Sequence, residues 1–424
     1  MAEKKRMQKP HYESICAFLK GEESTANPEC SNANSENPWE YDFKYQYDNG
    51  NANKYWNLDE ERDSIKRFLK YKIERKDCEE ARPPFDCDGT GEGKEKFVCL
   101  LTRQIYRTLW GWMDEKNPAE TNIEKRTVKR YAYLSTVSFL SFGPDTMNSY
   151  MTVLKHALEI SDGKNILEDF RKKINDRYFN GKKNQKEISE LFLYRLLIEM
   201  ADEGINLSEY IPSEIPYTDL EKFAEKYHAL GNFTLVPAGF NTDRAGKFND
   251  FWDQSLLYLK QKAQENSALG FERAFTKYIN YFFLWDYTIC GRKKAEYHVK
   301  SLFSEKFKST GVPYKSDILV NGTREMPTSD ETKTFLSNVL WAIRRRGIFM
   351  TAMLQLQQEI GEEKYSRLRN DIFAVDTCYK GFDCVIARVV EWLNDNDWVL
   401  PDTVRKTLEK EWTVPESKVE PSSK

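Results

Sequence analysis

HALGNFTLVPAGFN, residues 228–241, is the stretch that decides which fold the sequence predicts. A Gly-Asn pair precedes the apolar run FTLV, and a Pro-Ala-Gly turn follows it. This order predicts a short strand with Phe233 and Leu235 on one face, closed by a turn. His228 and Asn241 flank the run. Two hypotheses follow: the stretch shapes a core, or it is the remnant of a metal-dependent nuclease site.

The bulk composition predicts a globular chain with more than one core. At 424 residues, the chain is long enough for two or three domains, with a single elongated helical body as the alternative. With 40% hydrophobic and 31% charged residues, it falls outside the disordered class. The 64 basic and 67 acidic residues leave a net charge of −3, which excludes a global positive field that would draw the chain to nucleic acid or to a membrane. Any site for a polyanion must therefore be a local patch.

Cysteine spacing and the N-terminal sequence point to the cytoplasm. None of the eight cysteines forms a C-x-x-C pair, so we expect mostly reduced thiols rather than a zinc knuckle or a small disulfide framework. Residues 1–14 are basic and lack the apolar region of about 7–15 residues that marks a secretory signal. No run reaches the roughly 18 apolar residues of a membrane span. The sequence therefore predicts a cytoplasmic protein with no membrane partner.

Apolar residues recur every three or four positions on both sides of the strand and predict amphipathic helices. These helices cover about 96–113, 124–142, 145–161, 164–177, 186–203, 248–262, 271–290, 294–307, 363–373, 381–394 and 401–411. Thr328–Glu331 has the T-x-x-E pattern of a capping box, which predicts the start of a long helix that ends near 361. The predicted fold class is mainly α: a helical body with a small central α+β, ββα-like insert.

The same patterns predict five parts along the chain. They are a polar, partly irregular N-terminal arm (1–60), a helical domain (61–204), a ββα-like module (205–262), a C-terminal helical domain (263–412) and a disordered tail (413–424). The opening stretch lies in the third part, where Ile-Pro and Pro-Ala-Gly segments interrupt the helical periodicity.

The segments EYIPS (209–213), GNFTLVP (231–237) and GFN (239–241) follow one another in this order. The order resembles the C-terminal, HNH-like nuclease module of bacterial restriction proteins of the GmrSD type. The resemblance implies a ββα clamp that holds one divalent metal, Mg²⁺ or Mn²⁺, against a scissile phosphate. Glu209 and Asn241 are the implied metal ligands.

The sequence departs from that pattern at the general base. The position that the module gives to histidine is Tyr210, and a tyrosine pKa near 10 makes this side chain a poor base at neutral pH. His228 is the histidine close enough in sequence to take its place. The catalytic candidates are therefore His228, Asn241 and Tyr210. The structural alternative is that His228 lies in the core and Asn241 caps the next helix.

A second resemblance concerns the residues that follow the strand. Asn241, Arg244, Asp250 and Asp253 follow a pattern that is similar to one in bacterial proteins of uncharacterised function. It implies a buried polar set in which Arg244 pairs with Asp250 or Asp253. The alternative role for Arg244 is to bind a phosphate. Because the function of those proteins is unknown, this resemblance names no reaction.

Basic residues give candidate contacts to nucleic acid. The candidates are Arg244, Arg344, Arg345, Arg346, Lys182 and Lys183. Three of the arginines stand in a row inside the long predicted helix, and the two lysines lie in a loop. Binding to phosphates needs several such charges on one surface. The alternative for the arginine row is a solvated helix face with acidic neighbours.

Two functions from different classes follow. The first is a nucleic-acid-directed protein, a phage-defence or mobile-element effector, whose HNH-like module is impaired or noncatalytic. The second is a helical interaction or scaffold protein with no catalytic activity and with a protein partner. Convergence of the basic residues beside His228 and Asn241 would favour nucleic acid. Burial and pairing of Asn241 and Arg244 would favour the scaffold.

Overall fold

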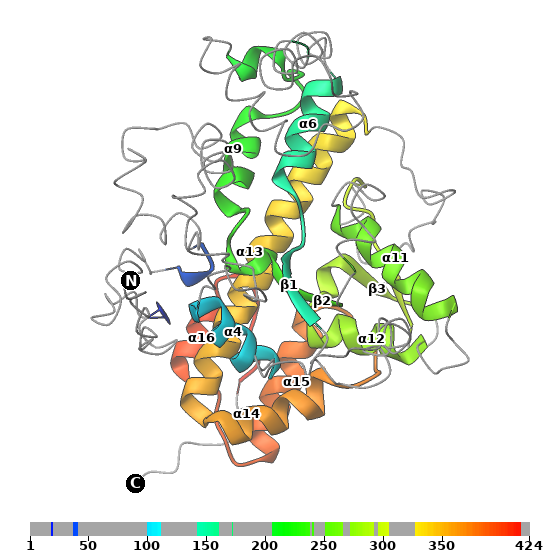
Figure 1. Cartoon of the computed structure of the whole chain (residues 1–424). Coiled ribbons are helices and arrows are strands. Elements are labelled where there is room, and N and C mark those ends of the chain that lie inside the picture. Colours follow the sequence, from blue (N-terminus) through cyan, green and yellow to red (C-terminus); the bar gives the residue numbers. More distant parts are fainter. Residues whose placement is uncertain are drawn as a thin grey trace, which may run out of the picture.

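One long helix, α13, runs through the described part of the molecule and organises it (Figure 1). The computed structural model describes residues 18–19, 37–40, 100–111, 142–160, 172, 206–237, 240, 251–265, 272–291, 296–304 and 327–416. Helix α13 spans Ser329–Ile360, and its 32 residues extend for about 48 Å at a rise of about 1.5 Å per residue. Within these residues, no helix is long and apolar enough to cross a membrane.

The start of α13 confirms the predicted capping box. The N–H of Glu331 donates to Thr328 Oγ1 at 3.3 Å, and the N–H of Thr328 donates to the Glu331 carboxylate at 2.8 Å. These bonds satisfy backbone N–H groups at the helix start, where the helix itself offers no acceptor. Gly361 ends the helix at a φ of 84°, a conformation that glycine adopts at little cost.

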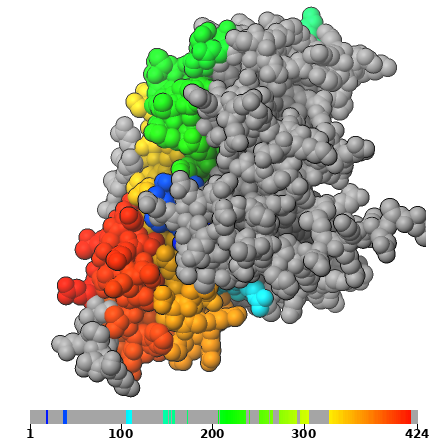
Figure 2. Space-filling view, turned by 90° about the vertical axis from the view of Figure 1, so that its left-hand side faces the viewer, coloured from blue at the N-terminus to red at the C-terminus, as the bar shows by residue number. Residues whose placement is uncertain are grey.

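The middle of α13 is a core helix, because residues 346–354 are buried at every position. Elements from many parts of the chain pack around α13, from η2 (Pro38–Glu40) near the N-terminus to α16 (Asp402–Leu408) near the C-terminus. The others are α4 (Leu100–Trp110), α6 (Tyr150–Ile160), α9 (Tyr217–Lys226), η7 (Leu230–Asn232), η9 (Trp285–Tyr287) and α14 (Glu362–Leu368). Figure 2 shows α9 in green, η2 in blue and α16 in red along one side of this helix.

The described strands form two small antiparallel sheets. Strand β2 (Phe233–Pro237) confirms the strand predicted from the opening stretch, and it pairs with β1 (Phe142–Thr146), with Thr146 opposite Phe233. The second sheet pairs β3 (Thr288–Cys290) with β4 (Tyr297–Val299). Strand β1 was not predicted. Its sequence, FGPDT, holds a Gly-Pro pair that opposes a helix, and its pairing is fixed by a segment far away in the sequence.

The fold class, mainly α with a small α+β part, is confirmed, and several boundaries are corrected. The helix predicted over 271–290 ends early: α12 spans Glu272–Tyr281, and Phe283 then takes a φ of 57°, which is incompatible with a right-handed helix. The helix predicted over 294–307 is wrong, since this region contains β4. Both errors arise where aromatic residues mimic a helical period.

The remaining helices agree with the sequence where the structure describes them. Helix α11 spans Trp252–Glu265, α15 spans Phe382–Asp395, and α14 continues into the π-helical turn η12 (Arg369–Phe373). The helices predicted over 124–142, 164–177 and 186–203 lie almost wholly outside the described residues. In the predicted tail, Val414 is buried and its carbonyl accepts a hydrogen bond from Arg405 at 3.4 Å, whereas residues 417–424 lie outside the described part.

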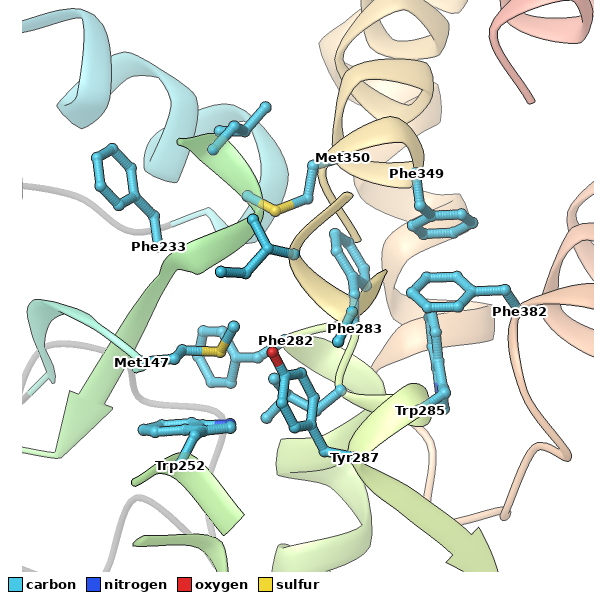
Figure 3. Packing of buried hydrophobic residues seen from close by; sticks show 14 of the residues in the cluster. Met147, Phe233, Trp252, Phe282, Phe283, Trp285, Tyr287, Phe349, Met350 and Phe382 are labelled. Carbon is cyan, nitrogen blue, oxygen red and sulfur yellow. The ribbon is translucent and has the colours of Figure 1, made fainter. Parts of the chain in front are cut away.

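Aromatic side chains fill the core between α13, η9 and α15 (Figure 3). Phe283 and Phe349 meet edge to face with ring centroids 5.1 Å apart, and Trp285 meets Phe382 in the same way at 5.0 Å. Fully burying one such side chain stabilises the fold by about 1.5–3 kcal/mol, and each aromatic pair adds about 0.5–1.5 kcal/mol. The aromatic content of the sequence is therefore used mainly for packing here.

Two glycines let the backbone of the GN segment touch the backbone of α13. A Cβ built on Gly231 would lie 1.8 Å from the carbonyl oxygen of Ile343, whereas a Cβ on Gly347 would lie 2.9 Å from the Cβ of Trp39. The first contact is with main-chain atoms that cannot rotate away. The glycine of the GN pair is thus required by close packing against α13.

We predict that Gly231→Ala destabilises the fold by at least about 3 kcal/mol, because the clash must be relieved by moving a helix or a strand. Gly347→Ala is the matched control. It gains about 1 kcal/mol of helix propensity. Its new Cβ lies 2.9 Å from the Cβ of Trp39, so η2 must shift slightly, and we expect a smaller loss than for Gly231→Ala. Urea unfolding of the two variants measures the difference. A loss for Gly231→Ala no larger than that for Gly347→Ala would contradict the close approach.

Buried tyrosines make the fold sensitive to alkali. Burial raises the pKa of Tyr281, Tyr287, Tyr297, Tyr365 and Tyr379 above the ordinary value of 10.0. A group whose pKa is higher in the folded state than in the unfolded state contributes its full stability at a pH below the unfolded-state pKa. That contribution is lost as the pH rises through the folded-state pKa.

We therefore expect the free energy of unfolding to fall as the pH rises above about 10. Burial lowers the pKa of Arg346 to about 10, which acts in the opposite direction, but the tyrosines outnumber it. Urea unfolding at stepped pH, read together with the phenolate absorbance, measures the effect. Phenolate absorbance that reaches the amplitude of all 23 tyrosines before the protein unfolds would contradict it.

Candidate functional site

Glu209 and Tyr210, an implied metal ligand and the residue at the implied base position, lie in a turn. They belong to η6 (Leu207–Tyr210), a 3-10 turn and not the strand that the nuclease module implies. The Asn206 side chain fixes this turn by accepting from the N–H of Ser208 at 3.2 Å. Pro212 follows closely and has no N–H for a strand ladder. The partner strand of β2 is β1, which comes from outside residues 205–262.

His228, the other candidate base, lies in the core. Its exposed fraction is 2%, and its ring meets the ring of Tyr227 edge to face at 4.2 Å. It lies in the short connection between α9 and η7. Glu209, in contrast, is exposed and accepts from Asn206 Nδ2 at 3.4 Å. The two side chains therefore do not share one solvent-facing site.

The roles of four other candidate residues stay predictions. Asn241, Arg244, Lys182 and Lys183 lie outside the described residues, so their roles in metal, phosphate or nucleic-acid binding are untested. Among the described residues, no group of three His, Cys, Asp or Glu side chains could hold a metal ion. The Mg²⁺ or Mn²⁺ that the resemblance implies thus finds no cluster of ligands in that part of the chain.

Asn232, the second residue of the GN pair, joins α9 to the end of β1. Its side chain is fully buried; Oδ1 accepts from the N–H of Asn148 at 3.0 Å. Its Nδ2 donates to the carbonyl of Tyr227 at 2.8 Å and to that of Asn148 at 3.2 Å. Asn148 Oδ1 in turn accepts from the N–H of Trp252, the first residue of α11. The asparagine pair therefore satisfies buried backbone groups of three elements.

Arg346 binds the GN segment from α13. Its guanidinium is fully buried, and Nη1 donates to the carbonyls of Gly231 at 2.8 Å and Phe233 at 2.5 Å. Its Nε donates to the carbonyl of Phe282 at 3.0 Å. Desolvation lowers its pKa to about 10, which still leaves it protonated at neutral pH. One charged side chain thus connects α13, the start of β2 and the end of α12 through charge-assisted hydrogen bonds.

Arg345 points to acidic partners instead. Its Nε lies 2.8 Å from Asp286 and its Nη1 lies 3.2 Å from Glu411. The guanidinium also stacks on the rings of Trp341 at 4.5 Å and Trp412 at 4.9 Å. Burial raises the pKa of Asp286, and the nearby Arg345 opposes that change. These contacts connect α13 to η9 and to the segment that follows α16.

Arg344 is the most exposed of the three arginines. It forms ion pairs with Glu411 at 3.5 Å and with Glu40 at 4.0 Å. The row RRR therefore spreads into three environments: a carbonyl cage, an acidic and aromatic pocket, and a surface ion pair. Every member has partners within the protein. This arrangement supports the alternative of acidic neighbours over a phosphate-binding face.

A polar cluster at the β3–β4 hairpin escaped the sequence analysis. Lys260 of α11 donates to the carbonyl of Tyr297 at 2.8 Å, and its Nζ lies 3.3 Å from His298 Nδ1 and 3.5 Å from Glu296. Desolvation lowers the pKa values of both Lys260 and His298. No local motif could have found this cluster, because its members come from different elements.

Beside this cluster, Asn280 holds the segment 374–381 against the hairpin. Its Nδ2 donates to the carbonyls of Val375 at 2.9 Å and Thr377 at 2.8 Å. Its Oδ1 accepts from Tyr297 Oη at 2.7 Å. Tyr297 Oη in turn accepts from the N–H of Tyr379 at 2.6 Å. Two thiols, Cys290 of β3 and Cys378, meet at this junction.

Comparison with known proteins gives no match: no family model, no curated protein and no solved structure is similar to the chain. The described geometry is therefore the basis for a functional conclusion. Its main feature is that the GNFTL stretch is bonded into the core by Asn232 and Arg346.

We predict that Arg346→Met lowers the free energy of unfolding by at least about 3 kcal/mol, because it leaves three buried carbonyls without their charged donor. Arg344→Met is the matched control and should change it by less than about 1 kcal/mol, since surface ion pairs contribute little. Chemical denaturation of both variants compares the two positions. Equal losses would show that Arg346 does not carry the junction.

Proposed function

We propose that the chain is a helical interaction or scaffold protein and that its GNFTL stretch is a noncatalytic structural module. The observation that carries this proposal is the Arg346 clamp. The long helix supplies a buried guanidinium to the carbonyls of Gly231 and Phe233, at the heart of the segment that resembles a nuclease. A segment held in this way positions the backbone of the core, and its polar groups are used for packing.

The described candidate residues lack the arrangement that a nuclease mechanism requires. A general base must reach an attacking water, yet His228 is 2% exposed. Tyr210 and Glu209 lie on a surface turn. A metal-assisted mechanism needs ligands that converge on one ion and on the phosphate. The described candidates are instead divided between the surface and the core.

A protein partner fits the described surface better than nucleic acid does. The exposed face of α15 carries Asp383, Arg388 and Glu391, and Arg388 pairs with Glu391. On α16, Asp402 and Lys406 are exposed in the same way. Binding to a polyanion needs several like charges along one surface, whereas mixed charges suit recognition of a protein.

We predict that the purified protein does not cleave plasmid DNA or structured RNA with Mg²⁺ or Mn²⁺. It should also bind neither at physiological salt, because the arginine row is already paired. Gel assays and fluorescence anisotropy measure both properties. Arg344→Glu, which reverses the exposed charge, should leave the anisotropy unchanged.

Two results would contradict the proposal in different ways. Metal-dependent cleavage that is lost in Glu209→Ala or Asn241→Ala would restore the nuclease hypothesis. Tight, salt-dependent binding without cleavage would instead support the nucleic-acid-directed hypothesis, that of a phage-defence or mobile-element effector with a noncatalytic module.

A further inference from the structure

We propose that Cys290 and Cys378 form a redox-active dithiol, which small disulfides of the glutathione type oxidise reversibly to an intramolecular disulfide. This inference goes beyond the proposed function and does not depend on it. It rests on the meeting of two thiols that are far apart in sequence and that the fold holds against each other.

The first support is the position of the two thiols. Cys290 is the last residue of β3, and its Sγ lies 3.0 Å from the carbonyl oxygen of Tyr379, the residue after Cys378. The side chains of Cys290 and Cys378 also lie close enough for each to shift the pKa of the other. Both side chains are half-buried, so a small reagent can reach the pair. Contact between two sulfur atoms is the geometric condition for a disulfide.

The second support is that the junction is preorganised on both sides. Asn280 binds the carbonyls of Val375 and Thr377, and Tyr297 accepts from the N–H of Tyr379. These contacts fix the backbone around Cys378 relative to the hairpin. Residues 374–381 contain neither helix nor strand, so side-chain hydrogen bonds and not a backbone ladder hold this segment. The two sulfurs are thus held together without a rigid element between them.

The third support is the division of roles between the thiols. The hydrogen bond from Cys378 lowers the pKa of Cys290, with help from the charges of Lys380 and Lys300, although burial opposes the change. The same hydrogen bond raises the pKa of Cys378. A dithiol redox site needs one thiolate that attacks the small disulfide and a neighbouring thiol that resolves the mixed disulfide.

The small disulfide supplies the oxidising equivalents for the reaction. The Cys290 thiolate attacks one sulfur of the small disulfide, forms a mixed disulfide and releases one thiolate. The Cys378 sulfur then attacks the Cys290 sulfur, and the second small thiolate leaves. The two protons of the protein thiols pass to the released thiolates. Two protein thiols are oxidised to one disulfide, and one small disulfide is reduced to two thiols.

The experiment places the full-length protein in buffers of reduced and oxidised glutathione at stepped ratios. Acid quenching, alkylation and peptide mass mapping then identify each disulfide. We expect one internal disulfide, between Cys290 and Cys378, which reduction with dithiothreitol removes. It should persist in Cys384→Ser, the matched control, because Cys384 is an exposed cysteine close to Cys378 in the sequence.

The variants separate the two roles. Cys378→Ser should accumulate glutathione on Cys290, since no resolving thiol remains, and Cys290→Ser should lose the internal disulfide completely. Mapping of the wild-type protein needs no variant and stays decisive if a variant fails to fold. The proposal is overturned by glutathione that stays on single cysteines of the wild type, by a disulfide to another cysteine, or by thiols that remain reduced throughout.

Discussion

A buried positive charge that donates its hydrogen bonds to backbone carbonyls sets the main constraint on this fold. Arg346 lies inside the core and donates to three backbone carbonyls, from the GN segment and from the end of α12. Desolvating a guanidinium is costly, and these three hydrogen bonds offset part of that cost, so the carbonyls must stay where they are. The close approach of Gly231 to α13 follows from the same geometry. Packing around α13 thus fixes β2, and β2 fixes the position of β1.

Local signals predicted the parts of the fold that depend on neighbouring residues. The capping box at Thr328 and the apolar periods of α11 and α15 are written in short stretches of sequence, and the structure confirms them. Long-range pairing was beyond such signals. The FGPDT sequence of β1 does not favour a strand until Phe233–Pro237 lies beside it. A row of three arginines is likewise typical of a solvated face, and only the tertiary structure places Arg346 among carbonyls.

The candidate site divides in the same way. The sequence singled out the GN pair but left two hypotheses open for it, a core element or the remnant of a nuclease site. In the structure, Asn232 satisfies backbone groups of α9 and β1, which is a role in packing. The thiol junction could not be found in the sequence, because Cys290 and Cys378 carry no motif and meet through Asn280 and Tyr297. The polar cluster of Lys260, Glu296 and His298 escaped sequence analysis for the same reason, since its members meet only in the folded chain.

The central claim is that the GNFTL stretch belongs to the same cooperative unit as α13. Native-state hydrogen exchange, read amide by amide for β2 and for residues 346–354, tests it most directly. If Arg346 couples the two elements, both should open with the same free energy, equal to that of global unfolding. Amides of β2 that open at a much lower free energy, while α13 stays protected, would contradict the account. The stretch would then be a separable unit, free to serve a function of its own.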